Sequence, residues 1–388
     1  MKKFWNLFLF LLPFLFYSHS KAEVEFDRGD RIVLYGNSFI ERMQQNGFFE
    51  AALHMAHPEK ELELRSLAWT GDELGYRLRP ERYVNHLKKL LARWPANHVI
   101  LGFGLYESFS GISEIQKFKD DLNNYLNEIE RRHPDAKIIM LSPIATEDLE
   151  HPHFPNPQKR NEEIKVFSNA MSNISKIRGV DFIDLFEFTK TQYNKHHKPL
   201  TDNSIHLNPK GHELVAEKIS RSVLGNEAFD ALDKNRMRSI AKAVSQKAHH
   251  VANVVRPVNT VLYFGVRGRA NEYESEIPRF HELIRTSDSL IHTMASDSDK
   301  TLNTLPLTLK PLIERTPAKL PSSDEMLKSF KVADGFEINL FASEEQFPEL
   351  CNPEQIAFDS KGRLLIAEAG TGKLLRFSPD ARKLEVLA

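Results

Sequence analysis

The chain of 388 residues contains a single cysteine, Cys351. One cysteine excludes an internal disulfide framework, a thiolate zinc site and a Cys-x-x-Cys-His haem attachment within this chain. Net charge is also nearly absent, because 52 Lys and Arg residues face 53 Asp and Glu residues, a formal charge of −1. The composition therefore gives no reason to expect a nucleic acid or an anionic membrane as a partner.

Long apolar runs are missing beyond the first 22 residues. Within residues 2–22, two lysines precede an apolar stretch at residues 4–17, and small residues stand at Ser20 and Ala22. This layout predicts a secretory signal peptide cut after Ala22, so that the mature protein works in the periplasm or outside the cell without a transmembrane span. An uncleaved membrane anchor is the alternative, which we disfavour because the run is short and Pro13 interrupts it.

Between residues 31 and 224, short apolar runs alternate with segments whose apolar residues recur every three or four positions. The predicted strands are residues 32–35, 62–67, 98–103, 137–141 and 180–185. The predicted helices are residues 39–54, 82–94, 114–132, 161–177 and 209–224. This alternation predicts an α/β fold with an open, doubly wound parallel sheet, in which ligands bind beyond the carboxyl ends of the strands.

After residue 225 the regular alternation of predicted strands and helices ends. Residues 226–255 are predicted as one long helix, followed by a strand-like stretch at 260–266 and a mixed segment up to residue 294. Residues 295–325, rich in Ser, Thr, Pro, Asp and Lys, are predicted as a linker. Short strands are then predicted at 336–341, 355–358, 363–367 and 373–377, with a turn at 359–362. They amount to one antiparallel sheet or one propeller blade, part of a larger β-architecture.

Ser38 is the first candidate for chemistry. In Gly36-Asn37-Ser38 a predicted strand ends at a glycine and a serine opens the next helix. The dipole and free amides of a helix N-terminus stabilise an oxyanion, so this hydroxyl is a candidate nucleophile. A simple N-cap role for the serine is the alternative.

His206 is the second candidate, in a polar loop just before the helix predicted at 209–224. A serine nucleophile needs a base, and the base needs a carboxylate or amide to hold it. Asp202 and Asn203 offer those groups nearby. Alternatively, His206 is an ordinary loop histidine and Asp202 caps a turn.

Two further loops carry glycines at the ends of predicted strands, Gly71 in one and Gly104, shortly before Tyr106, in the other. Glycine lets a backbone amide come close to a ligand. Each of these loops alone is compatible with simple turn chemistry. All four polar segments, however, are predicted at the same end of the sheet.

In that order, the four segments resemble the conserved blocks of the SGNH (GDSL-like) hydrolase superfamily over roughly residues 30–225. The resemblance implies a flavodoxin-like α/β/α fold and ester hydrolysis through a Ser–His–Asp triad. It implies Ser38 as the nucleophile and His206 as the catalytic base. It also implies an oxyanion hole made by the amides of Ser38 and Gly71, with residue 106 as a third member.

Two residues depart from that family's pattern. Tyr106 stands where the family has an asparagine, and losing one oxyanion donor costs about 10²–10³ in rate. Asn203 stands where the family has an aspartate, and Asp202 lies one position further back. Either Asp202 reaches the imidazole or Asn203 only orients it, and a neutral orienting group in a serine triad can cost about 10⁴.

The end of the chain carries a second resemblance, in residues 330–342 and 358–368. These segments are similar to the opening blade of a β-propeller found in large secreted proteins of planctomycete-like bacteria, of the membrane-bound dehydrogenase type. The N-terminal part is similar to the SGNH-like module that precedes such propellers. The predicted organisation is a signal peptide at 1–22, an SGNH hydrolase-like domain at 28–225, a helical extension at 226–294, a linker at 295–325 and a partial propeller blade at 326–388.

Two functional hypotheses follow. The first is an exported serine ester hydrolase that acts on a small-molecule or carbohydrate ester, where the carbohydrate is implied by the resemblance alone. The second is a catalytically degenerate module that binds a saccharide or docks onto the propeller, motivated by Tyr106 and Asn203. No cofactor or metal is expected, because the histidine pairs at 151–153 and 196–197 lie in loops without a carboxylate pattern. The sequence does not determine the oligomeric state.

Overall fold

The computed structural model describes residues 23–74, 94–256, 270–297, 321–369 and 372–387. These residues fall in two compact units, Met1–Leu309 and Lys310–Ala388, and each is described here by itself. Some predictions lie wholly or mostly outside the described residues: the signal peptide at 1–22, the helix at 82–94, the strand at 260–266 and the linker at 295–325. Among the described helices, none has both the length and the apolar character that crossing a membrane requires.

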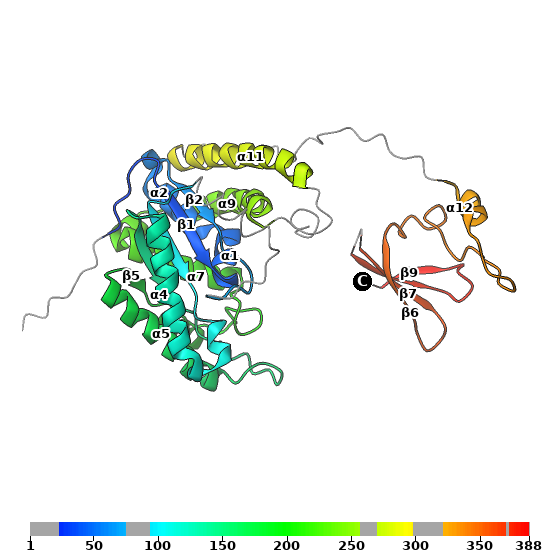
Figure 1. Ribbon diagram of the computed structural model, residues 1–388, viewed down its shortest axis with the longest axis horizontal. Helices are drawn as coiled ribbons and strands as arrows, with labels where there is room; N and C mark the ends of the chain where they lie inside the picture. The colour runs from blue at the N-terminus through cyan, green and yellow to red at the C-terminus, as the bar shows by residue number, and fades with distance from the viewer. Residues whose placement is uncertain (1–22, 75–93, 257–269, 298–320, 370–371, 388) are drawn as a thin grey trace, which may run out of the picture. The chain divides into compact units, whose positions relative to one another are not determined.

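A five-stranded parallel sheet forms the centre of the first unit (Figure 1). Its strands are β1 (Arg31–Gly36), β2 (Glu63–Ser66), β3 (His98–Gly102), β4 (Lys137–Leu141) and β5 (Asp181–Ile183). They lie in the order β2-β1-β3-β4-β5, and every neighbouring pair is parallel. This is the order of a flavodoxin-like sheet, so the predicted α/β fold is confirmed. The strand order reverses between β1 and β3, and ligands of such sheets bind at that point.

Helices cover both faces of this sheet. They are α1 (Ser38–Asn46), α2 (Phe48–Ala56), α4 (Ile115–Arg132), α5 (Pro157–Arg178), α6 (Phe186–Lys195) and α7 (Pro209–Leu224). Successive residues of a strand point to opposite faces. In β1, Ile32 and Leu34 belong to the core shared with α1, α2 and α7, whereas Val33 and Tyr35 belong to the core shared with α4 and α5. The result is the three-layer α/β/α arrangement expected from the resemblance.

The helix predicted at 39–54 is two helices, because the chain turns at Gly47. Gly47 has a φ of +70°, which favours glycine, and a Cβ there would lie 2.4 Å from the carbonyl oxygen of Ala241. The helix predicted at 226–255 is also divided, into α8 (Asn226–Asp230) and α9 (Lys234–Val255). The Asp233 side chain accepts a hydrogen bond from the amide of Arg236 and so starts α9 anew. Both single-helix predictions were wrong, because the spacing of apolar residues continues unchanged across a position where one helix ends and the next begins.

Buried charges attach α9 and α11 (Ala270–Ser296) to the sheet domain. The Lys247 side chain of α9 is fully buried, and its ammonium group donates to the carboxylates of Glu50 in α2 and Asp288 in α11. Arg65 of β2 donates to the same Asp288 with an Nη1–Oδ1 distance of 3.1 Å. Burial favours a neutral Asp288, yet Lys247 and Arg65 together hold its pKa below the ordinary value. Two cations and two anions thus balance inside the structure.

The second unit contains an antiparallel sheet, as predicted. Its strands are β6 (Pro353–Phe358), β7 (Leu364–Glu368), β8 (Lys373–Phe377) and β9 (Leu384–Val386), paired in chain order. The strand predicted at 336–341 is wrong, because those residues form no strand and Phe336 is 75% exposed. Part of the predicted linker is helical, since Ser322 and Glu325 form a capping box that begins α12 (Ser323–Ser329). Membership of a propeller stays a prediction.

Replacing Lys247 by Met should lower the free energy of unfolding by about 3–5 kcal/mol, because Glu50 and Asp288 would stay buried without their shared cation. Urea unfolding of the full chain measures this. The matched control is Lys242→Met on the exposed face of the same helix, which should stay within about 0.5 kcal/mol of the parent protein. Equal unfolding midpoints for the two variants would contradict a stabilising role of the cluster.

Candidate active site

Ser38 lies at the point where the strand order reverses. β1 ends at Gly36, beside the end of β3, and a Cβ on Gly36 would lie 2.4 Å from the carbonyl oxygen of Gly102. Asn37 then caps α1, since its side-chain oxygen accepts from the amide of Phe39 at 3.1 Å. Ser38 is therefore the first residue of the helix, with its hydroxyl at the positive end of the helix dipole.

A chain of hydrogen bonds runs from Ser38 to the loop before α7. The amide of Gly71 donates to Ser38 Oγ at 3.0 Å, and Ser38 Oγ lies 2.7 Å from the hydroxyl of Tyr106. The Tyr106 hydroxyl lies 3.0 Å from His206 Nε2, and His206 Nδ1 lies 3.1 Å from Asn203 Oδ1. The structure thus brings together one residue from each of the four predicted segments, with Asn203 as a fifth member.

The direction of these hydrogen bonds follows from the Asn203 side chain. Its Oδ1 also accepts from the backbone amide of His206 at 3.1 Å, so the oxygen faces the ring and Nδ1 carries the proton. Nε2 of the neutral imidazole is then an acceptor. Tyr106 donates to it, and Ser38 donates to the oxygen of Tyr106. The two hydroxyl protons, of Ser38 and of Tyr106, therefore both point along the hydrogen bonds toward His206.

Asn203 contacts the imidazole and Asp202 does not. Within the described residues, the Asp202 carboxylate is exposed and makes no hydrogen bond, while its backbone amide donates to the carbonyl oxygen of His206 at 2.8 Å. The pKa of His206 lies below its ordinary value, because the ring is half-buried and Arg42 is nearby, and the charge of Asp202 opposes this only partly. The imidazole is therefore neutral, and able to accept a proton, at neutral pH.

Two buried glutamates position the loops of the site, and the sequence analysis missed both. Glu107 follows Tyr106, and its carboxylate accepts from the amide of Leu74 at 2.9 Å and from that of Gly104 at 2.7 Å. It therefore ties the loop that carries Gly71 to the loop that carries Tyr106. Burial raises the pKa of Glu107 to about 7, although these amides partly offset the effect.

Glu147 does the same for the loop of His206. Its carboxylate accepts from the amides of Leu200 and Thr201, at 2.9 Å and 2.7 Å, and its own amide donates to the carbonyl oxygen of Ser204 at 2.9 Å. A carboxylate that holds backbone amides leaves no spacing motif in a sequence. Only the position of Glu107, directly after a candidate site residue, was a signal that could have been used.

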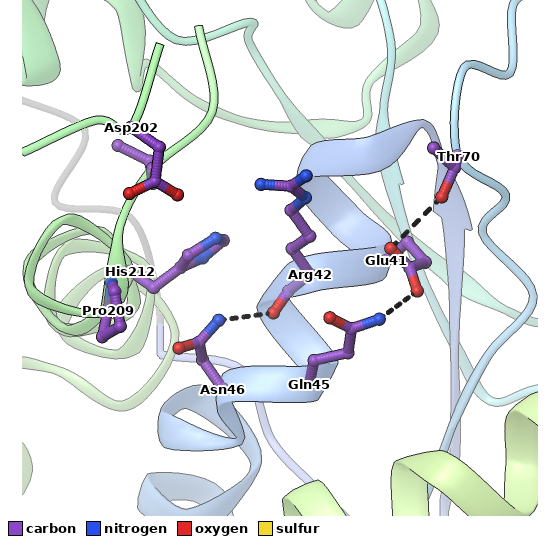
Figure 2. Close-up of a pocket in the computed structure, with 9 residues that line it drawn as sticks. Glu41, Arg42, Gln45, Asn46, Thr70, Asp202, Pro209 and His212 are labelled. Carbon is purple, nitrogen blue, oxygen red and sulfur yellow. Dashed lines mark hydrogen bonds between the residues drawn. The ribbon is translucent and has the colours of Figure 1, made fainter. Parts of the chain in front are cut away.

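A cavity of about 380 Å³ is lined by neighbours in sequence of these residues, although not by Ser38, Tyr106 or His206 themselves (Figure 2). Its lining comes from α1, from the loops of Gly71 and His206, and from the start of α7: Glu41, Arg42, Gln45, Asn46, Thr70, Asp202, Leu207, Pro209 and His212. Most of these side chains are polar. Among the residues that the structure places, no group of His, Cys, Asp and Glu is arranged to hold a metal ion.

Comparison with known proteins agrees with the family resemblance of the first unit. Residues 34–214 match the model of the GDSL-like lipase/acylhydrolase family. No curated protein matches the chain.

Several solved structures are similar to the first unit. The acetyl xylan esterase AlAXEase is 18% identical, covers 50% of this chain and 99% of its own, and has a TM-score of 0.39. The acetylxylan esterase Axe2 from Geobacillus stearothermophilus is 14% identical over 52% of this chain and 96% of its own, with a TM-score of 0.39. The α/β hydrolase LAE5 from the metagenome of Lake Arreo is 16% identical over 52% and 97%, with a TM-score of 0.40.

Replacing Asn203 by Asp should raise the pKa of His206, because a carboxylate beside Nδ1 favours the imidazolium. An NMR titration of the His206 ring protons measures the change. The control, Asp202→Asn, removes a charge that raises the pKa of His206 and should shift the titration slightly in the opposite direction. A downward shift or no shift in the Asn203→Asp protein would show that residue 203 does not contact the ring in solution.

Proposed function

Because residues 34–214 form a domain of the GDSL-like lipase/acylhydrolase family, we propose that this chain is an exported serine ester hydrolase in which Ser38 is the nucleophile and His206 the base. The observation that carries the proposal is the continuous chain of hydrogen bonds from Ser38 through Tyr106 to His206. Export is proposed from the layout of residues 2–22.

The proposed reaction begins when Ser38 Oγ attacks the carbonyl carbon of the ester. The serine proton passes to the oxygen of Tyr106 while the Tyr106 proton passes to His206 Nε2, so the phenol is neutral before and after the transfer. Collapse of the tetrahedral intermediate expels the alcohol, which receives its proton back along the same path. Water then attacks the acyl-enzyme with the same groups acting as base and acid, and releases the carboxylic acid.

The oxyanion of the intermediate needs donors that are already in place. The amide of Gly71 lies 3.0 Å from Ser38 Oγ, and the amide of Ser38 belongs to the first turn of α1, whose N–H groups lack partners within the helix. We assign these two amides to the oxyanion hole. Tyr106, expected from the resemblance to be its third member, bridges Ser38 and His206 instead.

The same position of Tyr106 also favours the second function, a module that binds without catalysis. A phenol held between a serine and a histidine keeps them from direct contact, and a side chain that never transfers its proton would leave Ser38 unreactive. For the substrate, we propose a carbohydrate ester, because polar side chains dominate the adjoining cavity. The two functions make opposite predictions for variants of Ser38 and Tyr106.

Replacing Ser38 by Ala should reduce the hydrolysis of p-nitrophenyl acetate at least about 10³-fold and abolish labelling by a fluorophosphonate probe. Ser113→Ala, an exposed serine away from the site, is the control and should keep the parent rate. If the Ser38→Ala protein hydrolyses the ester as fast as its parent, the hydrolase function is wrong and the binding module stands.

Replacing Tyr106 by Phe should lower kcat about 10²–10³-fold with little change in KM, because it removes the group that carries the proton and leaves the ring in place. Tyr106→Asn, which restores the residue expected from the family, should be the more active of the two variants. If Tyr106→Phe equals or exceeds the parent enzyme, the hydroxyl transfers no proton and instead restrains Ser38.

A further inference from the structure

We propose that the cavity between α1, the loop of Asp202 and the start of α7 is a subsite for a carboxylate-bearing sugar, in which Arg42 binds the carboxylate and His212 and Asp202 bind hydroxyl groups. The inference rests on the proposed function only in making that sugar the alcohol part of the ester. The preferred substrates are then O-acylated sugar acids rather than neutral acylated sugars.

Arg42 reaches this cavity from the same helix as the nucleophile. It follows Ser38 by four residues, so both lie on one face of α1. Figure 2 shows its guanidinium beside α1, between Asp202 on one side and Thr70 on the other. Within the described part of the chain the guanidinium makes no hydrogen bond and no ion pair, although it is half-buried. A cation without such a partner is available to a ligand.

The neighbouring carboxylate does not neutralise Arg42. Glu41 lines the same cavity, but its carboxylate pairs with Arg256 at 3.1 Å and accepts hydrogen bonds from Gln45 and Thr70. Asp202 is exposed at the rim of the cavity and forms no ion pair with Arg42. Within the described residues, no ion pair therefore offsets the charge of Arg42, and the unpaired carboxylate of Asp202 is exposed.

His212 adds a second unused polar group. Only 2% of the residue is exposed, it stacks on Phe39, and neither ring nitrogen has a hydrogen-bond partner within the described residues. Burial lowers the pKa of His212 to about 3, so the ring is neutral and offers one donor and one acceptor. A sugar hydroxyl, itself both donor and acceptor, satisfies such a ring, and a buried polar group without a partner costs free energy until it is satisfied.

These groups together select a class of ligand. A fatty acyl chain finds only Leu207 and Pro209 as apolar partners in the lining. A simple dicarboxylic acyl group would satisfy Arg42 but supplies no hydroxyl for His212 or Asp202. A uronic acid supplies a carboxylate for the guanidinium and hydroxyls for the other two groups. The volume of about 380 Å³ lies in the range of small-molecule sites.

The test is a binding measurement with the full chain carrying Ser38→Ala, so that no turnover interferes. Isothermal titration at low salt compares methyl glucuronoside with methyl glucoside, which differ only in the carboxylate. We expect the glucuronoside to bind at least about tenfold more tightly, because a charge-assisted hydrogen bond to Arg42 is available only to it. Arg42→Gln should erase the difference, and Arg42→Lys should keep part of it.

Arg178→Gln, at the end of α5, is the matched control and should leave the difference intact. Equal affinity for the two glycosides, no binding of the glucuronoside, or an unchanged preference in Arg42→Gln would each overturn the subsite. Equal affinity would indicate a neutral saccharide as the ligand instead.

A kinetic measurement separates this inference from the proposed function. The ratio of kcat/KM for monoacetylated methyl glucuronoside to that for monoacetylated methyl glucoside should exceed about ten in the parent protein and fall to about one in Arg42→Gln. If the chain hydrolyses both esters with a ratio near one, the subsite is wrong and the hydrolase stands. If it hydrolyses neither yet binds the glucuronoside through Arg42, the hydrolase is wrong and the subsite stands.

Discussion

The hydroxyl of Tyr106 is the only link between Ser38 and His206 among the hydrogen bonds of the described residues, and the proposed chemistry depends on it. A phenol can pass a proton only if both of its neighbours are held within hydrogen-bond distance. Glu107 supplies that constraint on one side by binding the amides of Leu74 and Gly104. Tyr106 and the buried carboxylate after it therefore act together: Tyr106 connects Ser38 to His206, and Glu107 holds the loop of Tyr106 to the loop of Gly71.

Charge serves two different purposes in this unit. Around Lys247, two cations and two anions neutralise one another in the interior and fasten α9 and α11 to the sheet domain. Beside the candidate active site the balance is incomplete, since Glu41 has Arg256 as its partner while Arg42 has none among the described residues. An unpaired, half-buried guanidinium is costly to keep unless a ligand uses it. The contrast between the two clusters is the main reason to regard the cavity as a binding site.

The separation of roles between Asp202 and Asn203 illustrates how a departure from a family pattern can be accommodated. A neutral amide holds the tautomer of His206, as an aspartate would, but would not stabilise the imidazolium that the proposed reaction forms. The charge of Asp202 still acts on the ring through space, without contact. In the proposed reaction, His206 is therefore a weaker base than a histidine held by a carboxylate.

The sequence alone determined the alternation of strands and helices, the position of Ser38 at a strand–helix junction and the four segments of the site. Each depends on apolar spacing or on a glycine within a few residues, and such local patterns survive without knowledge of the fold. The spacing of apolar residues gave a wrong prediction at Gly47, because the helix ends there without any change in that spacing. It also gave a wrong prediction at residues 336–341, which form no strand. Only the tertiary structure decided that Tyr106 lies between Ser38 and His206, which are 68 and 100 residues away from it in the chain. It also decided that Glu107 and Glu147 hold the loops and that the Arg42 guanidinium has no partner among the residues that the structure describes. The physical reason is that these contacts form when distant segments pack together. The residues next to them in sequence show no pattern from which the contacts could be predicted.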